Sequence, residues 1–346
     1  MKRLLVLAPL TAVALAAACS SSGGDVVQSS STASSGSSSS GSAASEATTV
    51  GMSYIPNIQF SPFYVAKDQG LFSKQGLDVT IRHHGAQEGL FTALTSGTEK
   101  YLISGADEVV QARSQGMDLV AIAPYFSQYP VVVIVPEDSD IKTTADLRGK
   151  KIGVAGKYGE SWFGLRVALK DGGLTEKDAT IQEIGYTQQA ALKTGKVDAV
   201  MGYSNNDLVQ LGLAGVKVRA IPIASSVPLV SISLVTTTKQ ATEHPDETKK
   251  VVEGMLQGIE AVRKDPAAAV TTSRKFVPGL SGAQAQKAAR ATLDATTRLM
   301  VDDSGNVTGT LDPAKFTTMV AFMKQTGLIT KEIDPAKAVS TAYSPR

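Results

Sequence analysis

The sequence predicts an α/β fold made of two blocks, in each of which short strands alternate with amphipathic helices. Alternation of this kind begins near residue 48, and a second alternating block begins near residue 151. From His244 onward the pattern is almost wholly helical. Strands that alternate with helical runs are typical of βαβ units and a parallel sheet. We therefore expect two lobes, joined by extended segments, with helices added at the C-terminal end.

The first block carries its strands and helices in regular order. Pro62 lies near the first turn of the first helix, where proline is favoured. The expected strands are 48–55, 78–84, 100–106 and 119–126, and the expected helices are 61–76, 87–97 and 107–116.

The second block repeats the alternation. Its expected strands are 151–156, 180–186, 198–203 and 218–224, with helices at 161–173, 188–197 and 205–215. The runs 131–138 and 229–238 connect the blocks, with hinge candidates near 130–136 and 228–236. We expect one lobe to comprise 48–133 plus 232–346, and the other 134–231.

Composition and charge restrict the class of protein. The chain has 346 residues, is 42% hydrophobic and 19% charged, and has a net charge of +2. That balance predicts neither nucleic-acid binding nor a polybasic membrane patch. His83 and His84 are neighbours on a predicted strand and would point to opposite faces. No Cys, His and Asp cluster has the spacing of a metal site, so we expect no metal and no cofactor.

The N-terminal segment is predicted to be a signal peptide, residues 1–18. Lys2 and Arg3 precede an apolar run that is too short to span a bilayer comfortably. It ends at Cys19, the only cysteine, in a pattern that resembles a bacterial lipoprotein signal, although Ala16 stands where that pattern prefers Leu. The alternative is an ordinary secretory signal with a chance cysteine. Residues 19–47 read as a lipidated cysteine and a disordered Ser/Gly linker, which predicts a lipid-anchored protein outside the cytoplasmic membrane.

Aromatic residues are concentrated at the first strand-to-helix corner. The chain is only 5% aromatic, yet residues 54–72 contain Tyr54, Phe60, Phe63, Tyr64 and Phe72. Ligands of open α/β sheets bind at the carboxyl ends of strands, over the following helix N-termini. A hydrophobic core explains some of these aromatics, and a site for a flat ligand explains the rest.

Similar corners, rich in aromatic and amide side chains, follow other predicted strands. They are "RHHGAQE", "APYFSQYP", "GKYGESW", "GYTQQ" and "GYSNN". Because such corners meet at one edge of a sheet, we expect a lined ligand site. The predicted ligand-binding residues are Tyr54, Asn57, Phe60, Phe63, His84, Gly105, Asp107, Glu108, Tyr125, Gly159, Glu160, Ser161, Trp162, Tyr186, Tyr203 and Asn205.

Two of these groups have alternative explanations. Asp107 and Glu108 could accept hydrogen bonds from ligand N–H groups, or could simply stabilise a helix N-terminus. Gly156, Gly159 and Ser161 open a helix that could bind an anion or a carbonyl, or could only cap it; the spacing of a phosphate-binding loop is absent.

Trp162, the only tryptophan, is predicted to form a wall of the ligand site opposite Tyr54 or Tyr125. The alternative is that it packs between helix and sheet. We predict no catalytic residues, because no Ser, His and Asp arrangement with a nucleophile elbow is visible.

Three segments carry a family resemblance. "YIPNIQFSPFYVAKDQGLFSKQGLDV", "TADLRGKKIGV" and "ALKTGKVDAVMGY" resemble the solute-binding proteins of ABC importers for nitrate, sulfonates and thiamine-pyrimidine precursors. The resemblance covers roughly residues 48–330. It implies a two-lobe periplasmic-binding-protein fold of type II, with a ligand cleft between lobes joined by two hinge strands. It also implies delivery of the ligand to a permease driven by an ATPase, and we expect a monomer.

Within that family, "IPNIQFSPFYVA" and "RHHGAQEGLFTAL" are more similar to the branch that binds flat heteroaromatic vitamins or precursors, of the thiamine-pyrimidine or riboflavin type. The alternative ligand is a sulfonate or nitrate-type anion. A more distant alternative is the yeast-type pyrimidine synthase, an enzyme with this fold that consumes one of its own histidines and needs a cysteine-rich iron site. A signalling receptor would need a transmembrane helix or an output module. We therefore predict a binding protein and not an enzyme.

Overall fold

The computed structural model describes residues 45–85 and 88–344, and these form two five-stranded sheets. The predictions for the signal peptide and Cys19 lie outside the described residues. The predicted linker ends slightly too late, because the first strand, β1, begins at Glu46. Within the described residues, no helix is long and apolar enough to cross a membrane.

The first sheet has the strand order β2-β1-β3-β10-β4. Its strands are β1 (Glu46–Met52), β2 (Leu77–His83), β3 (Tyr101–Gly105), β4 (Leu119–Pro124) and β10 (Ile232–Thr237). β1 pairs in parallel with β2 and β3, whereas β10 is antiparallel to both β3 and β4.

The second sheet has the order β7-β6-β8-β5-β9. Its strands are β5 (Val131–Pro136), β6 (Lys151–Val154), β7 (Thr180–Glu183), β8 (Ala199–Tyr203) and β9 (Val218–Pro222). β6 is parallel to β7 and β8, and β5 is antiparallel to β8 and β9. The predicted α/β class and two-lobe type II fold are confirmed, since helices connect most successive strands within each sheet.

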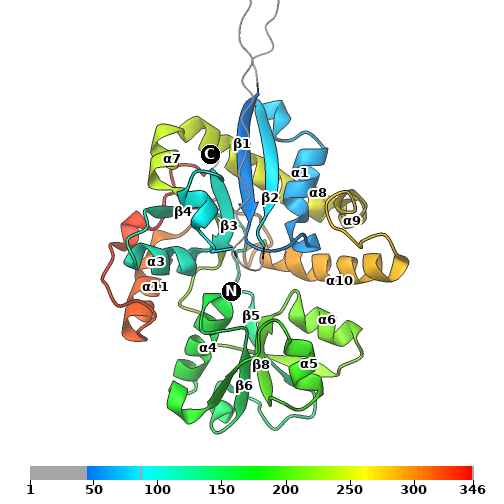
Figure 1. Cartoon of the computed structure of the whole chain (residues 1–346), viewed down its shortest axis with the longest axis vertical. Coiled ribbons are helices and arrows are strands. Elements are labelled where there is room, and N and C mark those ends of the chain that lie inside the picture. Colours follow the sequence, from blue (N-terminus) through cyan, green and yellow to red (C-terminus); the bar gives the residue numbers. More distant parts are fainter. Residues whose placement is uncertain (1–44, 86–87, 345–346) are drawn as a thin grey trace, which may run out of the picture. The chain divides into compact units, whose positions relative to one another are not determined.

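Helices flank both sheets (Figure 1). In the view of Figure 1, α4, α5 and α6 surround the second sheet, and α1 and α8 lie beside β1 and β2. The helices are α1 (Ser61–Asp68), α2 (Thr92–Thr95), α3 (Ala106–Ser114), α4 (Gly159–Asp171), α5 (Gln188–Lys193), α6 (Asp207–Leu213), α7 (Thr238–Glu243), α8 (Pro245–Lys264), α9 (Pro266–Ser273), α10 (Ala283–Leu299) and α11 (Pro313–Gln325).

Local sequence explains where several C-terminal helices begin. Pro266 and Pro313 each stand at the first helical position, where a missing N–H is harmless. The preceding Asp265 and Asp312 accept hydrogen bonds from backbone N–H groups of the first turn.

The runs 131–138 and 229–238, expected to connect the blocks, instead contain β5 and β10, which are antiparallel strands inside the sheets. These are the strands by which the chain enters each sheet from the other, after the short connections 125–130 and 223–231. A parallel connection within a sheet needs a crossover of about a dozen residues, usually a helix, and a strand that arrives from elsewhere has no such requirement. Each sheet therefore contains one antiparallel strand near its centre.

The same connections correct the predicted hinges. Most of the segments 130–136 and 228–236 belongs to β5 and β10, which are paired inside their sheets. The crossings that lie outside the strands come just before them, at 125–130 and 223–231. The expected boundary at residue 134 falls inside β5, because β-rich composition does not mark where pairing starts.

The aromatic corner that begins the first lobe contributes mainly to the core. Phe63, Tyr64 and Phe72 are buried, and the Phe63 ring lies 6.2 Å from Phe72 and 5.9 Å from Tyr125. Helix α8 approaches α1 closely at Gly258, where a Cβ would stand 2.2 Å from the backbone oxygen of Pro62. Phe63 and Tyr125, both predicted ligand residues, thus fill the interior instead.

Candidate functional site

Helices α3 and α4 bring three carboxyl groups together from the two lobes. Strand β3 runs directly into α3, so Asp107 and Glu108 fall in its first turn. Glu160 occupies the first turn of α4, which follows β6. The partial positive charge of a helix N-terminus favours carboxylates there. The carboxyl side chains of both lobes are therefore directed toward the same junction.

The two helix N-termini approach each other at Gly159. This residue has φ of 67°, a conformation that favours glycine, and a Cβ built on it would lie 3.3 Å from Glu108 Oε1. On the α3 side, the backbone N–H of Gly105 donates to Glu108 Oε2 at 3.0 Å, and that of Glu108 donates to Asp107 Oδ1 at 2.8 Å. Gly105 and Gly159 thus support the cluster through backbone shape rather than side-chain chemistry.

Hydroxyl groups connect the carboxyls. Tyr129 donates to Asp107 Oδ2 at 2.8 Å, and its oxygen lies 3.2 Å from the backbone oxygen of Glu160. Tyr203 donates to Glu160 Oε2 at 2.8 Å, and Ser231 donates to Glu160 Oε1 at 3.2 Å. We refer to Asp107, Glu108 and Glu160 as the carboxyl cluster.

Burial changes the protonation of this cluster. Asp107 and Glu160 are only 0% and 2% exposed. Burial, followed by the charge of Glu160, raises the pKa of Asp107 well above its usual range. Burial raises the pKa of Glu108 to about 7, and burial together with the charge of Glu108 raises the pKa of Glu160 to about 8. At neutral pH the cluster therefore holds protons, and offers hydrogen-bond donors as well as acceptors.

Exposed tyrosines lie beside the cluster. Tyr54 of the first lobe and Tyr186 of the second meet edge to face, with ring centroids 6.2 Å apart. Tyr158 and Tyr186 are 56% and 64% exposed, which is unusual for side chains of this size. Although much of Tyr186 is exposed, its partial burial, followed by the neighbouring Tyr158, raises its pKa to about 12, and the charge of Glu108 also contributes. These rings therefore present aromatic surface close to the carboxyl cluster.

Amide side chains form a second connection between the lobes. Asn57 Oδ1 accepts from the backbone N–H of Gln59 at 3.1 Å. Gln59 Oε1 in turn accepts from Asn205 Nδ2 at 2.8 Å. Asn57 and Asn205, both predicted ligand residues, are thus linked through Gln59.

Other predicted residues are engaged elsewhere. Phe60 is buried in the core with 7% exposure, and Ser161 is 9% exposed. The Nε2 of His84 lies 3.0 Å from both carboxylate oxygens of the buried Glu99. Tyr125 donates to the backbone oxygen of Gln59 at 2.6 Å and stacks on Phe126 at 5.2 Å. These side chains have structural partners that account for their positions.

The structure corrects the predicted position of Trp162. Its ring is 6% exposed and lies under the cations of Lys157 and Arg166, each 5.5 Å from its centroid. Residues of a helix turn by about 100° each, so Trp162 points roughly 200° away from Glu160. Trp162 and Glu160 therefore lie on nearly opposite sides of α4. The alternative explanation, packing of the indole, fits the structure.

Sequence reasoning missed four participants. Tyr129 and Tyr158 lie in the corners "APYFSQYP" and "GKYGESW", and could have been selected as the tyrosines of those corners. Gln59 belongs to the first corner and could have been found from its amide. Ser231 had no signal, because it lies in a crossing segment without a motif.

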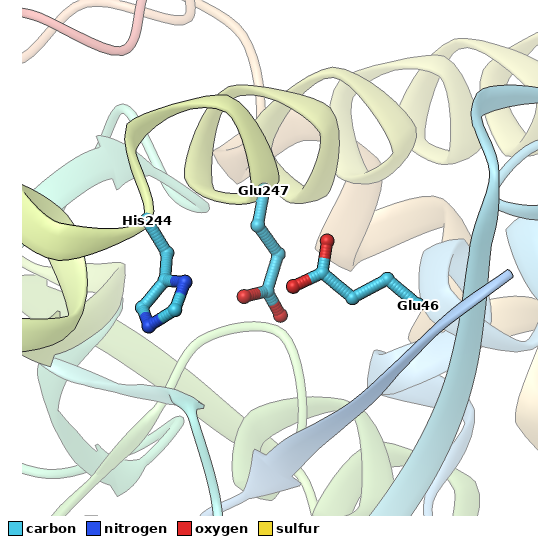
Figure 2. A group of neighbouring side chains, drawn as sticks. All are labelled: Glu46, His244 and Glu247. Carbon is cyan, nitrogen blue, oxygen red and sulfur yellow. The ribbon is translucent and has the colours of Figure 1, made fainter.

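A separate group of side chains has the arrangement of a possible metal site. Ligand atoms of Glu46, His244 and Glu247 lie within 4.8 Å of one another, with Glu247 between the other two (Figure 2). However, Lys100 Nζ lies 2.9 Å from Glu247 Oε1 and 3.7 Å from Glu46 Oε1. Glu247 also accepts from Thr48 and from Gln240 Nε2. The lysine ammonium supplies the positive charge that an ion would bring, so the donor set fits an ion pair.

Comparison with known proteins agrees with the fold. Residues 57–269, more than half of the chain, match the family described as NMT1/THI5 like. The chain belongs to this family.

Relatives of this NMT1/THI5-like protein include binding proteins and enzymes. It is 32% identical to the riboflavin-binding protein RibY of Chloroflexus aurantiacus over 235 residues, 67% of each chain. It is 24% identical over 233 residues to the 4-amino-5-hydroxymethyl-2-methylpyrimidine phosphate synthase of Uromyces fabae, covering 64% of this chain and 68% of the synthase.

Among solved structures, the alkanesulfonate-binding protein SsuA of Xanthomonas axonopodis pv. citri, bound to MOPS, superposes with a TM-score of 0.67 at 20% identity. The match covers 85% of this chain and 98% of SsuA. At this identity the likeness shows the shared fold alone. The predicted membership of the solute-binding family is confirmed.

Proposed function

We propose that this NMT1/THI5-like protein is an extracytoplasmic solute-binding lipoprotein of an ABC importer, and that its ligand is a flat, uncharged heteroaromatic ring. Riboflavin is the first ligand to test, and a thiamine pyrimidine the second. The ligand contacts both lobes, where Asp107 and Glu108 meet Glu160, and closure follows from contacts made with both at once.

The carboxyl cluster is the observation that carries this proposal. Its members come from α3 and α4 on different lobes, and Glu108 and Glu160 have pKa values raised to about 7 and 8. A partly protonated cluster can donate to an acceptor atom of a ring and accept from an N–H group. A flavin ring carries carbonyl oxygens and a ring N–H, and an aminopyrimidine carries ring nitrogens and an exocyclic amino group, so both ring types offer acceptors and donors at their edges.

The tyrosines support a flat ligand. Tyr54, Tyr158 and Tyr186 place aromatic surface next to the cluster from both lobes. A ring stacked against such a side chain gains about 0.5–1.5 kcal/mol beyond the area it buries. The tyrosine rings would stack on the flat face of the ligand, and the carboxyl groups would form hydrogen bonds with the atoms at its edge.

The alternative ligand, a sulfonate or nitrate-type anion, fits the site poorly. The charges that act on Asp107 and Glu160 come from other carboxyl groups, and a bound anion would add a further negative charge in a buried position. The N-terminus of α4, considered above as an anion site, lies against Glu108. The similarity to SsuA shows the shared fold alone.

The enzyme alternative is disfavoured by composition. The synthase resemblance implies a cysteine-rich iron site, whereas the whole chain has one cysteine, Cys19. His83 is held by Tyr64 Oη at 2.9 Å and by the backbone oxygen of Tyr54 at 3.0 Å, and burial lowers its pKa. We infer that His83 orients the tyrosines and that the protein performs no chemistry.

The transport role rests on the N-terminal sequence and on the family. We propose that Cys19 is lipidated and that the Ser/Gly segment after it is a flexible linker. The anchored monomer would then deliver ligand to a permease and its ATPase. Replacing Cys19 by Ser should release the protein from the membrane without changing ligand affinity. Lipid labelling and cell fractionation would measure this, and a variant that stays labelled and membrane-bound would contradict the anchor.

Calorimetric titration tests the ligand class. The purified protein is titrated with riboflavin, with 4-amino-5-hydroxymethyl-2-methylpyrimidine and with an alkanesulfonate. We expect saturable binding of one of the two rings and none of the sulfonate. Tighter binding of the sulfonate than of either ring would overturn the proposed ligand class, while leaving the solute-binding fold intact.

A further inference from the structure

Helix α10 presents two buried threonines to the second lobe. Thr292 and Thr296 are one helical turn apart, so they share a face of the helix, and they are 1% and 0% exposed. Thr296 Oγ1 accepts from Asn205 Nδ2 at 3.0 Å, and Thr292 Oγ1 accepts from Gln210 Nε2 at 3.0 Å. Asn205 lies between β8 and α6, and Gln210 lies within α6, so both amides belong to the second lobe.

The contact at Thr296 is directional. Its hydroxyl donates to the backbone oxygen of Thr292 at 2.7 Å, so toward Asn205 it can only accept. Asn205 has two amide hydrogens, and Nδ2 also donates to Gln59 Oε1 at 2.8 Å. Gln59 lies in the 3-10 helix Ile58–Phe60, just before α1. Asn205, fully buried, is therefore bound to two separate elements of the first lobe.

We propose that the threonine face of α10 is the closure clasp of this protein. Thr296 and Thr292 hold Asn205 and Gln210 when the lobes are together, and separation of the lobes breaks these bonds. The clasp consists of protein groups alone, so it biases the lobes toward closure before any ligand binds. It depends on the two-lobe hinged fold, and not on the identity of the ligand.

A buried acceptor keeps the clasp from being strong. Asn205 Oδ1 has no hydrogen-bond partner among the described residues. A buried polar atom without a partner opposes burial, because in water it would be hydrogen-bonded. The favourable contacts of the Asn205 amide hydrogens are thus partly offset by its oxygen. This balance suits a protein that must open again to release its ligand.

Thr296→Val is the informative variant. It keeps the shape of the side chain but removes the acceptor, which leaves an Asn205 N–H unpaired only while the lobes are together. Thr297→Val is the matched control, since it makes the same substitution one position along the helix. The Thr297 hydroxyl donates within α10, to the backbone oxygen of Asp294 at 3.1 Å. Any general cost of valine in the helix is common to both variants.

Distance measurement between the lobes tests the clasp without ligand. Because Cys19 is the only cysteine, a Cys19→Ser background accepts spin labels at Lys74→Cys and Lys193→Cys, two exposed positions on different lobes. In wild type we expect a populated short distance. In Thr296→Val the ratio of short to long distances should fall about fivefold or more, as the loss of one hydrogen bond implies. Thr297→Val should leave the ratio unchanged.

Two results would overturn the clasp. One is an identical distance distribution for Thr296→Val and Thr297→Val, and the other is a wild-type protein without any short-distance population. Gln210→Ala is a second variant that should fold normally, because Gln210 is exposed. It should lower the ratio of short to long distances by less than Thr296→Val does. If the fully folded Gln210 variant and Thr296→Val both leave the distances unchanged, the threonine face has no part in closure. None of these readouts depends on which ligand the protein binds.

Discussion

Glu247 and Glu160 are both buried, but their neighbours differ. Glu247 accepts from Lys100, Thr48 and Gln240. Burial acts to raise its pKa, but the hydrogen bonds of Thr48 and Lys100 outweigh burial and lower it. Around Glu160 the neighbours that act on its pKa are Glu108 and hydroxyl groups, and its pKa rises to about 8.

This difference distinguishes a carboxylate with a structural role from the cluster to which we assign ligand binding. A carboxylate that already has a cation and hydrogen-bond donors has little left to offer a ligand. A carboxyl group that burial holds in its uncharged form destabilises the folded state when it ionises. In the uncharged form it can both donate and accept hydrogen bonds. Glu247 therefore links β1 and the loop before β3 to α8, whereas Glu160 and its hydroxyl partners lie at the junction of the lobes, where we propose that the ligand binds.

The largest expected effect concerns stability at Glu247. Glu247→Ala leaves Lys100, Thr48 and Gln240 without their acceptor, so we expect the free energy of unfolding to fall by about 2–4 kcal/mol. Urea denaturation measures this, with Glu253→Ala on the exposed face of the same helix as the control, expected to change it by about 0.5 kcal/mol or less. Ligand affinity should not change. An unaltered stability would show that the ion pair contributes nothing.

The next effect concerns affinity at Asp107. Asp107→Ala removes a hydrogen-bonding carboxyl group from the cluster, and should weaken binding of the heteroaromatic ligand by about 1.5–3 kcal/mol. Calorimetry on the wild type, on this variant and on Asp118→Ala, an exposed aspartate after the same helix, measures the loss. Equal affinities for all three proteins would show that Asp107 does not bind the ligand and only stabilises the N-terminus of α3.

The two acidic groups also predict opposite pH dependences. Glu160 has a raised pKa, so the folded state binds more protons than the unfolded chain between pH 4.5 and 8, and stability falls as pH rises through that window. Glu247 has a lowered pKa, so its contribution is present above pH 4.5 and is lost as pH falls below it.

Substitution of Glu160 tests the predicted fall in stability at higher pH. In Glu160→Gln, the decline in unfolding free energy between pH 6 and 8.5 should shrink by about 2–3 kcal/mol, because one raised carboxyl pKa is gone. Urea denaturation at several pH values provides the measurement. A decline as steep as that of the wild type would mean that Glu160 ionises without penalty.

The smallest effect concerns the aromatic surface. Tyr186→Leu keeps apolar area but removes the ring, and should weaken ligand binding by about 1 kcal/mol through lost stacking. Tyr186 is 64% exposed, so the fold should tolerate the change. The same calorimetric titration is the test, and an undiminished affinity would remove Tyr186 from the ligand site.

Much of the fold could be predicted from local pattern. The order of strands and helices follows hydrophobic periodicity, and Asp107, Glu108 and Glu160 could be selected because a strand end and a helix start mark the corner on which each sits. The antiparallel pairing of β5 and β10 could not be predicted, since it depends on which sheet receives a strand.

Side-chain direction was the main source of error at the candidate site. Trp162 lies only two residues after Glu160, yet that spacing puts it on nearly the opposite side of α4. The sequence predicts Phe63 and Tyr125 as ligand residues because they are aromatic and lie at strand-to-helix corners. Aromatic side chains at such corners can equally well pack in the core. Ser231 and Tyr129 join the cluster from the crossing segments, where no periodic pattern marks them.

The protonation of Glu160 tests the central claim most directly. Carboxyl-carbon NMR can follow its titration, with the resonance assigned by its disappearance in Glu160→Gln and with Glu247 as an internal reference. We predict that Glu160 titrates near pH 8, that Glu247 titrates below pH 4.5, and that a bound riboflavin or pyrimidine ring shifts the first resonance but not the second. A Glu160 that titrates near 4.5, or that does not respond to a ring that binds, would contradict the assignment of the ligand site to the carboxyl cluster.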